Sequence, residues 1–215
     1  MEDVLAVYKR PYDPRFPQVC LDELSKQLLK DKRERLPMRP GDVEQYDSEY
    51  EREGVCQIFV ASEPLAGQRL LQVRERRTKK DWAEFVRELI DVHYPTAEKI
   101  VLVMDNLNTH SPASFYEAFE PAEAWRLSQK LEIHCTPTHG SWLNMAEIEL
   151  SVLARQALAE RMPSIQVVQE QVSAWQQQRN HAQATINWRF TAEDARIKLK
   201  RLYPSLKESS PSKEA

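Results

Sequence analysis

The sequence predicts an α/β layered domain, and the order of its apolar patterns carries that prediction. Short apolar runs typical of strands come first, at 19–21, 55–61 and 69–74. A helical periodicity and the most apolar run of the chain, 99–104, follow, and helical spacing dominates after Asn144. The 215 residues are enough for one domain with a buried core.

Composition excludes several classes of protein. Hydrophobic residues make up 41% of the chain and charged residues 29%, which is typical of a soluble globular protein. No apolar run approaches the roughly 18 residues of a membrane span, and the N-terminus lacks a signal-peptide core, so we expect a cytoplasmic protein without a membrane partner. The 3 cysteines have no zinc or redox spacing. The net charge of −3 leaves no basic footprint of nucleic-acid binding.

The first half of the chain is predicted to form strands around one charged loop. The buried run 19–21 ends in acid at Asp22. Residues 31–53 are almost all charged and contain prolines and a glycine, which predicts a loop or irregular hairpin. The runs 55–61 and 69–74 are separated by a proline and a glycine, as a β-hairpin requires.

The middle of the chain alternates helix and strand. Thr78 is a good N-cap with Asp81 three positions on, and apolar residues then recur at helical spacing over 79–93. The run 99–104 is apolar on both faces and stops at Asp105, which predicts a central parallel strand.

Shorter elements complete the predicted fold. Ser111, followed by proline, predicts a short helix to about Phe119, and 131–136 is predicted to be another strand. Residues 205–215 are predicted to be a disordered tail. The last helices are expected from Asn144, from Ser164 through Trp175, and after the cap Thr191.

Two acids, Asp22 and Asp105, follow predicted strands. Ligands collect at the carboxyl ends of strands in open α/β sheets, so neighbouring strands would bring these carboxylates together. Two carboxylates a few ångströms apart repel unless a cation lies between them, and such hard oxygen ligands suit Mg²⁺ or Mn²⁺. An acid at a strand end can also mark where the chain reaches water, and this alternative stays open.

A third acid, Glu147, lies in the first turn of the helix predicted from Asn144. These two residues have capping-box spacing, which is a sufficient structural reason for an acid there. Glu149 comes two positions later and points to another face, so it cannot share a role with Glu147. The spacing of these residues in the sequence does not by itself show that Glu147 lies near Asp22 and Asp105.

Three runs of the sequence carry a further signal. They are Val-Cys-Leu-Asp-Glu at 19–23, Val-Leu-Val-Met-Asp-Asn-Leu-Asn-Thr-His at 101–110, and Pro-Thr-His-Gly-Ser-Trp-Leu-Asn-Met-Ala-Glu-Ile-Glu at 137–149. Together they resemble the catalytic domain of DDE transposases, with bacterial insertion-sequence transposases related to the mariner elements as the nearest group. The resemblance covers residues 1–204 and implies an RNase H-like fold, a mixed sheet flanked by helices with further helices at the C-terminus.

One departure from the family pattern concerns spacing. Asp105 and Glu147 are 42 positions apart, which is longer than in the mariner relatives. The excess fits an insertion at 119–125, distant from the acids. It weakens the assignment to the subgroup more than the implied chemistry.

The resemblance implies metal-dependent chemistry on DNA. Asp22, Asp105 and Glu147 would be the catalytic residues and would hold two Mg²⁺ or Mn²⁺ ions for DNA end cleavage and strand transfer. The expected partners are double-stranded DNA, at an element's ends and at the target, and a second copy of the chain. The expected location is the nucleoid in a bacterial cytoplasm.

A complete transposase of this kind would begin with helix-turn-helix domains that read DNA, and nothing precedes Met1 here. The sequence-reading module is therefore expected to be absent from this chain and supplied by an upstream partner. The alternative is a truncated, non-catalytic remnant that regulates full-length transposase.

Several residues near these motifs are candidates for DNA contact. A histidine could orient a phosphate, a tryptophan could stack on an unpaired base, and a positive cluster at a helix start could hold phosphates. A solvent-facing histidine, a packing tryptophan and a solvated helix start are the competing interpretations. The candidates are His110, His139, Trp142, Arg74, Arg76, Arg77, Lys79 and Lys80.

Overall fold

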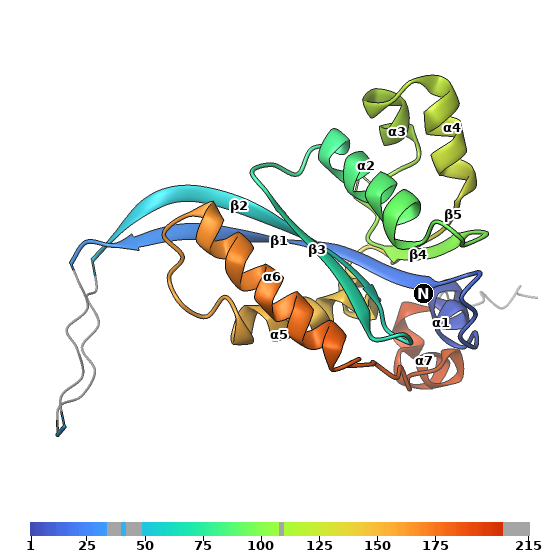
Figure 1. The fold of residues 1–215 in the computed structure, drawn as a ribbon. Coiled ribbons are helices and arrows are strands. Elements are labelled where there is room, and N and C mark those ends of the chain that lie inside the picture. Colours follow the sequence, from blue (N-terminus) through green and yellow to red (C-terminus); the bar gives the residue numbers. More distant parts are fainter. Residues whose placement is uncertain (34–39, 42–48, 108–109, 204–215) are drawn as a thin grey trace, which may run out of the picture.

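The computed structural model describes residues 1–33, 40–41, 49–107 and 110–203, and within them it forms a mixed five-stranded sheet (Figure 1). The strands are β1 (Gln18–Asp31), β2 (Tyr50–Glu63), β3 (Gln68–Arg74), β4 (Ile100–Met104) and β5 (Leu131–Cys135). Their order is β3-β2-β1-β4-β5. The β1–β2 and β2–β3 pairs are antiparallel, and the β1–β4 and β4–β5 pairs are parallel. The predicted α/β class and the central parallel strand at 100–104 are confirmed.

Helices lie on both faces of the sheet, with α2, α3 and α4 over one face and α5 and α6 over the other (Figure 1). Helix α2 continues as a turn of π-helix over Leu89–His93, and short 3₁₀ turns occupy Ser141–Leu143 and Lys200–Leu202. The α-helices are α1 (Glu2–Tyr8), α2 (Lys79–Glu88), α3 (Ala113–Ala118), α4 (Pro121–Gln129), α5 (Ala146–Gln156), α6 (Ile165–His181) and α7 (Ala192–Lys198).

Three apolar clusters fill the spaces between these layers. The first packs Trp82 and Phe85 of α2 against Leu21 and Leu102 of the central strands. The second joins α5 and α6 to the inner side chains of β1, β2 and β3. The third joins α1, α7 and the start of α5 to alternate residues of β1 and β4. Because β1 and β4 contribute to clusters on both faces, they are the buried centre of the sheet.

β1 and β2 are longer than the sequence predicts. The expectation that the first strand ends at Asp22 is wrong, since β1 continues to Asp31 and pairs with β2 as far as Tyr50. Beyond Glu23 only one face of β1 is covered: Leu24 and Leu28 pack into the second cluster, while Ser25 and Gln27 on the other face are exposed. A strand covered on one side needs few apolar residues, so its charged sequence predicted a loop. The rest of the charged segment, 34–39 and 42–48, lies outside the described residues.

Helix caps follow the predicted chemistry at several ends. Thr78 and Thr191 each form a capping box, with Asp81 and Asp194 respectively, and Ser164 accepts a hydrogen bond from the amide of Val167. Helix α6 extends to His181, past the expected end at Trp175. Helices α1 and α4 were not predicted, and α4 begins within the segment 119–125 that the sequence analysis assigned to an insertion.

In the part of the chain that the structure describes, no helix has the length and apolar character needed to cross a bilayer. The predicted tail, 205–215, lies outside the described residues.

Removal of side-chain volume under α5 is expected to destabilise the fold strongly. Leu153 is fully buried in the second cluster, so Leu153→Ala is expected to lower the free energy of unfolding by about 2–5 kcal/mol. Ile148 lies on the same helix but is exposed, and Ile148→Ala is expected to change it by no more than about 0.5 kcal/mol. Urea unfolding of both variants checks this, and equal losses would contradict the assigned packing.

Candidate active site

Two of the three predicted acids come together through strand pairing. β1 pairs in parallel with β4 so that Cys20 lies opposite Val103. Continued by two residues, this register places Asp22 opposite Asp105, just past the end of β4. Cys20 and Val103 both belong to the third apolar cluster. Side chains alternate along a strand, so Asp22 projects to that side of the sheet, while Asp105 follows the last residue of β4 and its carboxylate contacts His110.

The carboxyl group of Asp22 is buried among other negative charges. The residue is 8% exposed, and its Oδ1 accepts a hydrogen bond of 2.8 Å from the amide of Glu23. Burial raises the pKa of Asp22 to about 7, and repulsion from Glu147 and Asp105 adds to the effect of burial. The charges of both other predicted acids therefore act on Asp22.

Asn144 connects the start of α5 to Asp22. Its side-chain amide donates to the backbone oxygen of Leu21 at 2.9 Å and to Oδ2 of Asp22 at 3.3 Å, while its Oδ1 accepts from the amide of Ala146 at 3.1 Å. The capping box expected between Asn144 and Glu147 is not formed, because α5 begins at Ala146 with Met145 as N-cap and no side-chain cap. Asn144 is instead buried against β1, and the exposed Glu147 forms no ion pair or side-chain hydrogen bond with another residue that the structure describes.

His110 holds the carboxylate of Asp105. Its Nδ1 lies 2.6 Å from Oδ1 of Asp105, and its Nε2 lies 3.5 Å from Oε2 of Glu23 without hydrogen-bond geometry. The ring stacks on Trp82 with 5.8 Å between centroids. Burial alone would lower the pKa of His110, but the hydrogen bond to Asp105 and the charge of Glu23 raise it to about 9. His110 is therefore a buried cation at neutral pH, with no surface left for a DNA phosphate.

The carboxylates of Asp22, Asp105 and Glu147 are chemically suited to bind a divalent cation, but their side chains are not arranged as a metal site. Among the described residues, no group of three or more His, Cys, Asp or Glu side chains is arranged so that it could hold a metal ion. The chemistry nevertheless fits, because Asp22 is repelled by the carboxylates of Glu147, Asp105 and Glu23 and, within the described ranges, forms no ion pair with a Lys or Arg. Carboxylate oxygens are the ligands that Mg²⁺ and Mn²⁺ prefer.

His139 and Trp142 lie on the tight loop before α5. His139 is exposed and has a φ of 61°, and the amide of Gly140 donates to the oxygen of Pro137 at 2.8 Å. A Cβ on Gly140 would lie 2.6 Å from Cγ of Pro137, so only glycine fits this turn. Trp142 is 44% exposed and meets Phe190 edge to face at 5.7 Å. Their contact with DNA stays a prediction.

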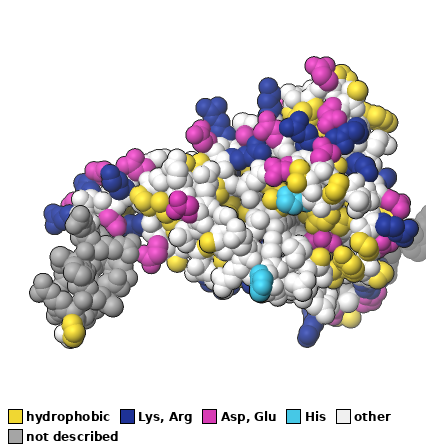
Figure 2. Space-filling model, viewed as in Figure 1, with side chains coloured by type: hydrophobic (Ala, Val, Ile, Leu, Met, Phe, Trp, Pro, Cys, Tyr) yellow, Lys and Arg dark blue, Asp and Glu magenta, His cyan; other side chains and the backbone are white. Residues whose placement is uncertain are grey.

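Most of the predicted basic cluster is neutralised by nearby acids. Arg74 pairs with Glu84 at 2.8 Å and also with Asp81, Arg77 pairs with Glu23, and Lys79 pairs with Glu117. On the face in Figure 2, basic and acidic side chains are interspersed over α2, α3 and α4.

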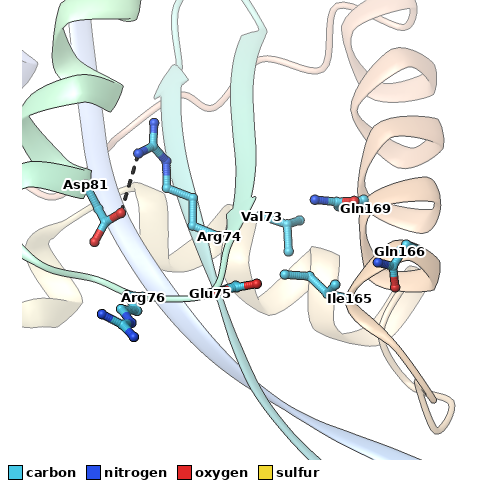
Figure 3. A pocket seen from close by; sticks show the side chains of 8 residues that line it. All are labelled: Val73, Arg74, Glu75, Arg76, Asp81, Ile165, Gln166 and Gln169. Carbon is cyan, nitrogen blue, oxygen red and sulfur yellow. Dashed lines mark ion pairs between the residues drawn. The ribbon is translucent and has the colours of Figure 1, made fainter.

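Two members of the cluster remain unpaired. Within the described ranges, Arg76 and Lys80 form no ion pair. Arg76 lines an open hollow of about 580 Å³ beside the start of α6, together with Arg74, Glu75, Asp81 and Gln169 (Figure 3). Because that hollow carries equal numbers of cations and acids, it is not a strong anion site by itself.

The mixed sheet and its two layers of helices define an RNase H-like domain. The family model described as DDE superfamily endonuclease matches residues 17–169, and the chain belongs to this family. Both the predicted family and the predicted fold are confirmed. A search of curated proteins found no match.

Solved structures of a transposase share this fold. The Mos1 mariner paired end complex with Mn aligns with a TM-score of 0.55 at 16% identity, covering 84% of this chain and 56% of that chain. The Mos1 strand transfer complex gives 0.55 at 14% identity, covering 84% and 55%. A pre-cleavage Mos1 transpososome gives 0.53 at 14% identity, covering 84% and 58%. The chain thus spans a little over half the length of these transposase chains.

Sequence reasoning missed Glu23 and the role of Asn144. Glu23 directly follows Asp22, so it lies on the opposite face of β1, where it meets His110 and Arg77. Asn144 was visible only as a helix cap. Its position in the Leu-Asn-x-x-Glu run is the signal that could have indicated this role. An asparagine just before a helix can hydrogen-bond a neighbouring strand as well as the first turn of its own helix.

The charge of His110 is expected to make stability depend on pH. Its pKa is raised from 6.5 to about 9 on folding, so its contribution is complete below about pH 6.5 and is lost as the pH rises through 9. The difference in unfolding free energy between wild type and His110→Gln is therefore expected to shrink over this range. Urea unfolding in EDTA at several pH values measures it. The control is exposed His139→Gln, and a difference independent of pH would contradict the assignment.

Proposed function

We propose that this chain is a transposase catalytic domain that cleaves DNA at the ends of an element and joins those ends to a target. Asp22, Asp105 and Glu147 are the catalytic residues and hold two Mg²⁺ or Mn²⁺ ions. The observation that carries the proposal is the parallel register of β1 and β4, which sets two acids side by side while the charge of the third acts on the first. The match to the DDE endonuclease family and the likeness to transposase complexes with DNA support it.

When bound, the two ions would activate an attacking oxygen and stabilise the leaving oxygen of a phosphodiester. The chain's own residues orient the ligands. His110 fixes Oδ1 of Asp105, and Asn144 fixes Asp22 relative to the start of α5. Glu147 is exposed, so its side chain can change rotamer to complete the ligand set.

Double-stranded DNA is the proposed substrate. Exposed Arg76, Lys80, His139 and Trp142 are the contacts that the observed burial and pairing favour. A homodimer on the paired ends and a helix-turn-helix module that reads them, supplied outside residues 1–215, complete the proposal.

Loss of the charge at Asp105 is expected to abolish metal-dependent cleavage. Asp105→Asn keeps the shape of the side chain but removes a metal ligand, so nicking of supercoiled DNA in Mn²⁺ is expected to fall by about 10²–10³-fold. The matched control is Asp91→Asn, which removes an acid that pairs with Arg126 on the surface and is expected to leave nicking unchanged.

Full nicking activity in Asp105→Asn would refute the assignment. No nicking by wild type or variant, together with binding to a full-length transposase, would favour the regulatory alternative.

The unpaired cations are expected to contribute most to DNA affinity. Arg76→Ala and Lys80→Ala are each expected to weaken binding to duplex DNA and to reduce the slope of log K against log[salt] by about 1, since each loses one phosphate contact. Fluorescence anisotropy across a salt series measures both. Arg126→Ala is the control, because Asp91 and Glu123 already neutralise that guanidinium. Unchanged slopes in the first two variants would exclude them from the interface.

A further inference from the structure

The first turn of α5 contains two acids in opposite surroundings. Glu147 is exposed, while Glu149 is 0% exposed. Two positions on an α-helix correspond to a rotation of roughly 200°, so the two side chains leave the helix on nearly opposite sides. Whatever holds Glu149 therefore also sets the direction in which Glu147 points.

Two arginines from other elements hold Glu149. Arg69 of β3 donates from Nε to Oε2 at 2.9 Å and from Nη2 to Oε1 at 2.8 Å, in the paired geometry that a guanidinium makes with a carboxylate. Arg179 of α6 donates from Nη2 to the same two oxygens at 3.0 and 3.2 Å. Arg69 is 1% exposed and Arg179 is 22% exposed, so solvent screens this network weakly.

Arg69 is itself part of a rigid frame. Its Nη1 donates to the oxygen of Gly67 at 2.9 Å, and its Nη2 donates to the oxygen of Ala184. The side chain of Asn180 in α6 bonds both the amide and the oxygen of Arg69 at 2.9 Å. Gly67 approaches Gln183 so closely that a Cβ would lie 2.6 Å from its carbonyl carbon. Glu149 is thus bound to a frame made by β3 and α6.

Glu147 lies between this frame and a second anchor. On its N-terminal side, Asn144 bonds the backbone of β1 at Leu21. We propose that Glu149 is a positioning residue, which fixes the rotation of the first turn of α5 and so keeps Glu147 within reach of Asp22. The inference rests on the proposed function, because there is a ligand to position only if Glu147 holds a metal ion.

The test is Mn²⁺ binding by the full chain, measured from the electron paramagnetic resonance signal of the free ion. Glu149→Gln is expected to bind Mn²⁺ about tenfold more weakly, because two arginines without their carboxylate repel each other and release the turn. Glu149→Asp keeps the charge and is expected to recover most of the affinity. The control is Glu63→Gln, which alters another buried acid, bonded to Tyr94 at 2.9 Å, and is expected to leave Mn²⁺ binding unchanged.

All variants are measured at a temperature at which circular dichroism shows them folded. Should Glu149→Gln fail to fold, Arg179→Gln removes only the more exposed arginine and is expected to weaken Mn²⁺ binding three- to fivefold. Wild-type affinity in the folded variant would overturn the positioning role. Glu147→Gln distinguishes a failure of the positioning role from a failure of the proposed function. If Glu147→Gln binds Mn²⁺ weakly and Glu149→Gln binds it normally, only the positioning role is rejected. Normal binding in Glu147→Gln rejects positioning and the proposed function together.

Discussion

The parallel pairing of β1 with β4 is the constraint on which the rest of the site depends. It sets Cys20 opposite Val103 and thereby brings Asp22 beside Asp105 at the end of β4. A slip of one residue in β1 would turn every side chain to the other face, so that Asp22 would move into the cluster around Trp82. Both strands bury apolar residues on both faces, and this two-sided burial is what holds the register.

That register places the Asp22 carboxylate in a buried position near other negative charges, and its hydrogen bonds do not fully stabilise its charged form. Asp22 accepts hydrogen bonds from the Glu23 amide and from Asn144, but burial, with added repulsion from Glu147 and Asp105, still raises its pKa to about 7. His110 is a cation at neutral pH, but it faces Asp105 and Glu23. Asp22 therefore needs either a proton or another cation near it, and a divalent ion in the proposed site would meet that need.

The sequence predicts those elements of the fold that are determined by residues close together in the chain. The run at 100–104 is apolar on both faces, as only a central strand needs to be, and Thr78 with Asp81 forms the capping box that their spacing indicates. The length of β1 could not be predicted in this way. Beyond Asp22 its pairing depends on β2, and its one covered face depends on α5 and α6, which come far later in the chain.

The same distinction between local and distant causes applies to the residues of the candidate site. Asp22 and Asp105 could be proposed because each follows an apolar run, and Glu147 because it follows the Leu-Asn-x-x pattern of the family that the sequence resembles. The partners that orient them could not, since each comes from a distant element. Asn144 follows the backbone of Leu21 by 123 positions, and Arg69 precedes Glu149 by 80. Likewise His110 could be selected as a neighbour of the acids, but its stacking on Trp82, which removes it from the surface, is a tertiary contact.

The two glutamates of the α5 turn show how a scaffold and a ligand site can share one element. A buried carboxylate between two guanidiniums has all its oxygens occupied, which makes it a good anchor and excludes it as a metal ligand. An exposed carboxylate with no cationic partner in the described chain has its oxygens free, but nothing about its own side chain fixes its direction. Precise metal sites require rigid support behind flexible ligands. The ion pairs of Glu149 fix the helix turn that carries Glu147 and so orient Glu147, which has no such contacts of its own.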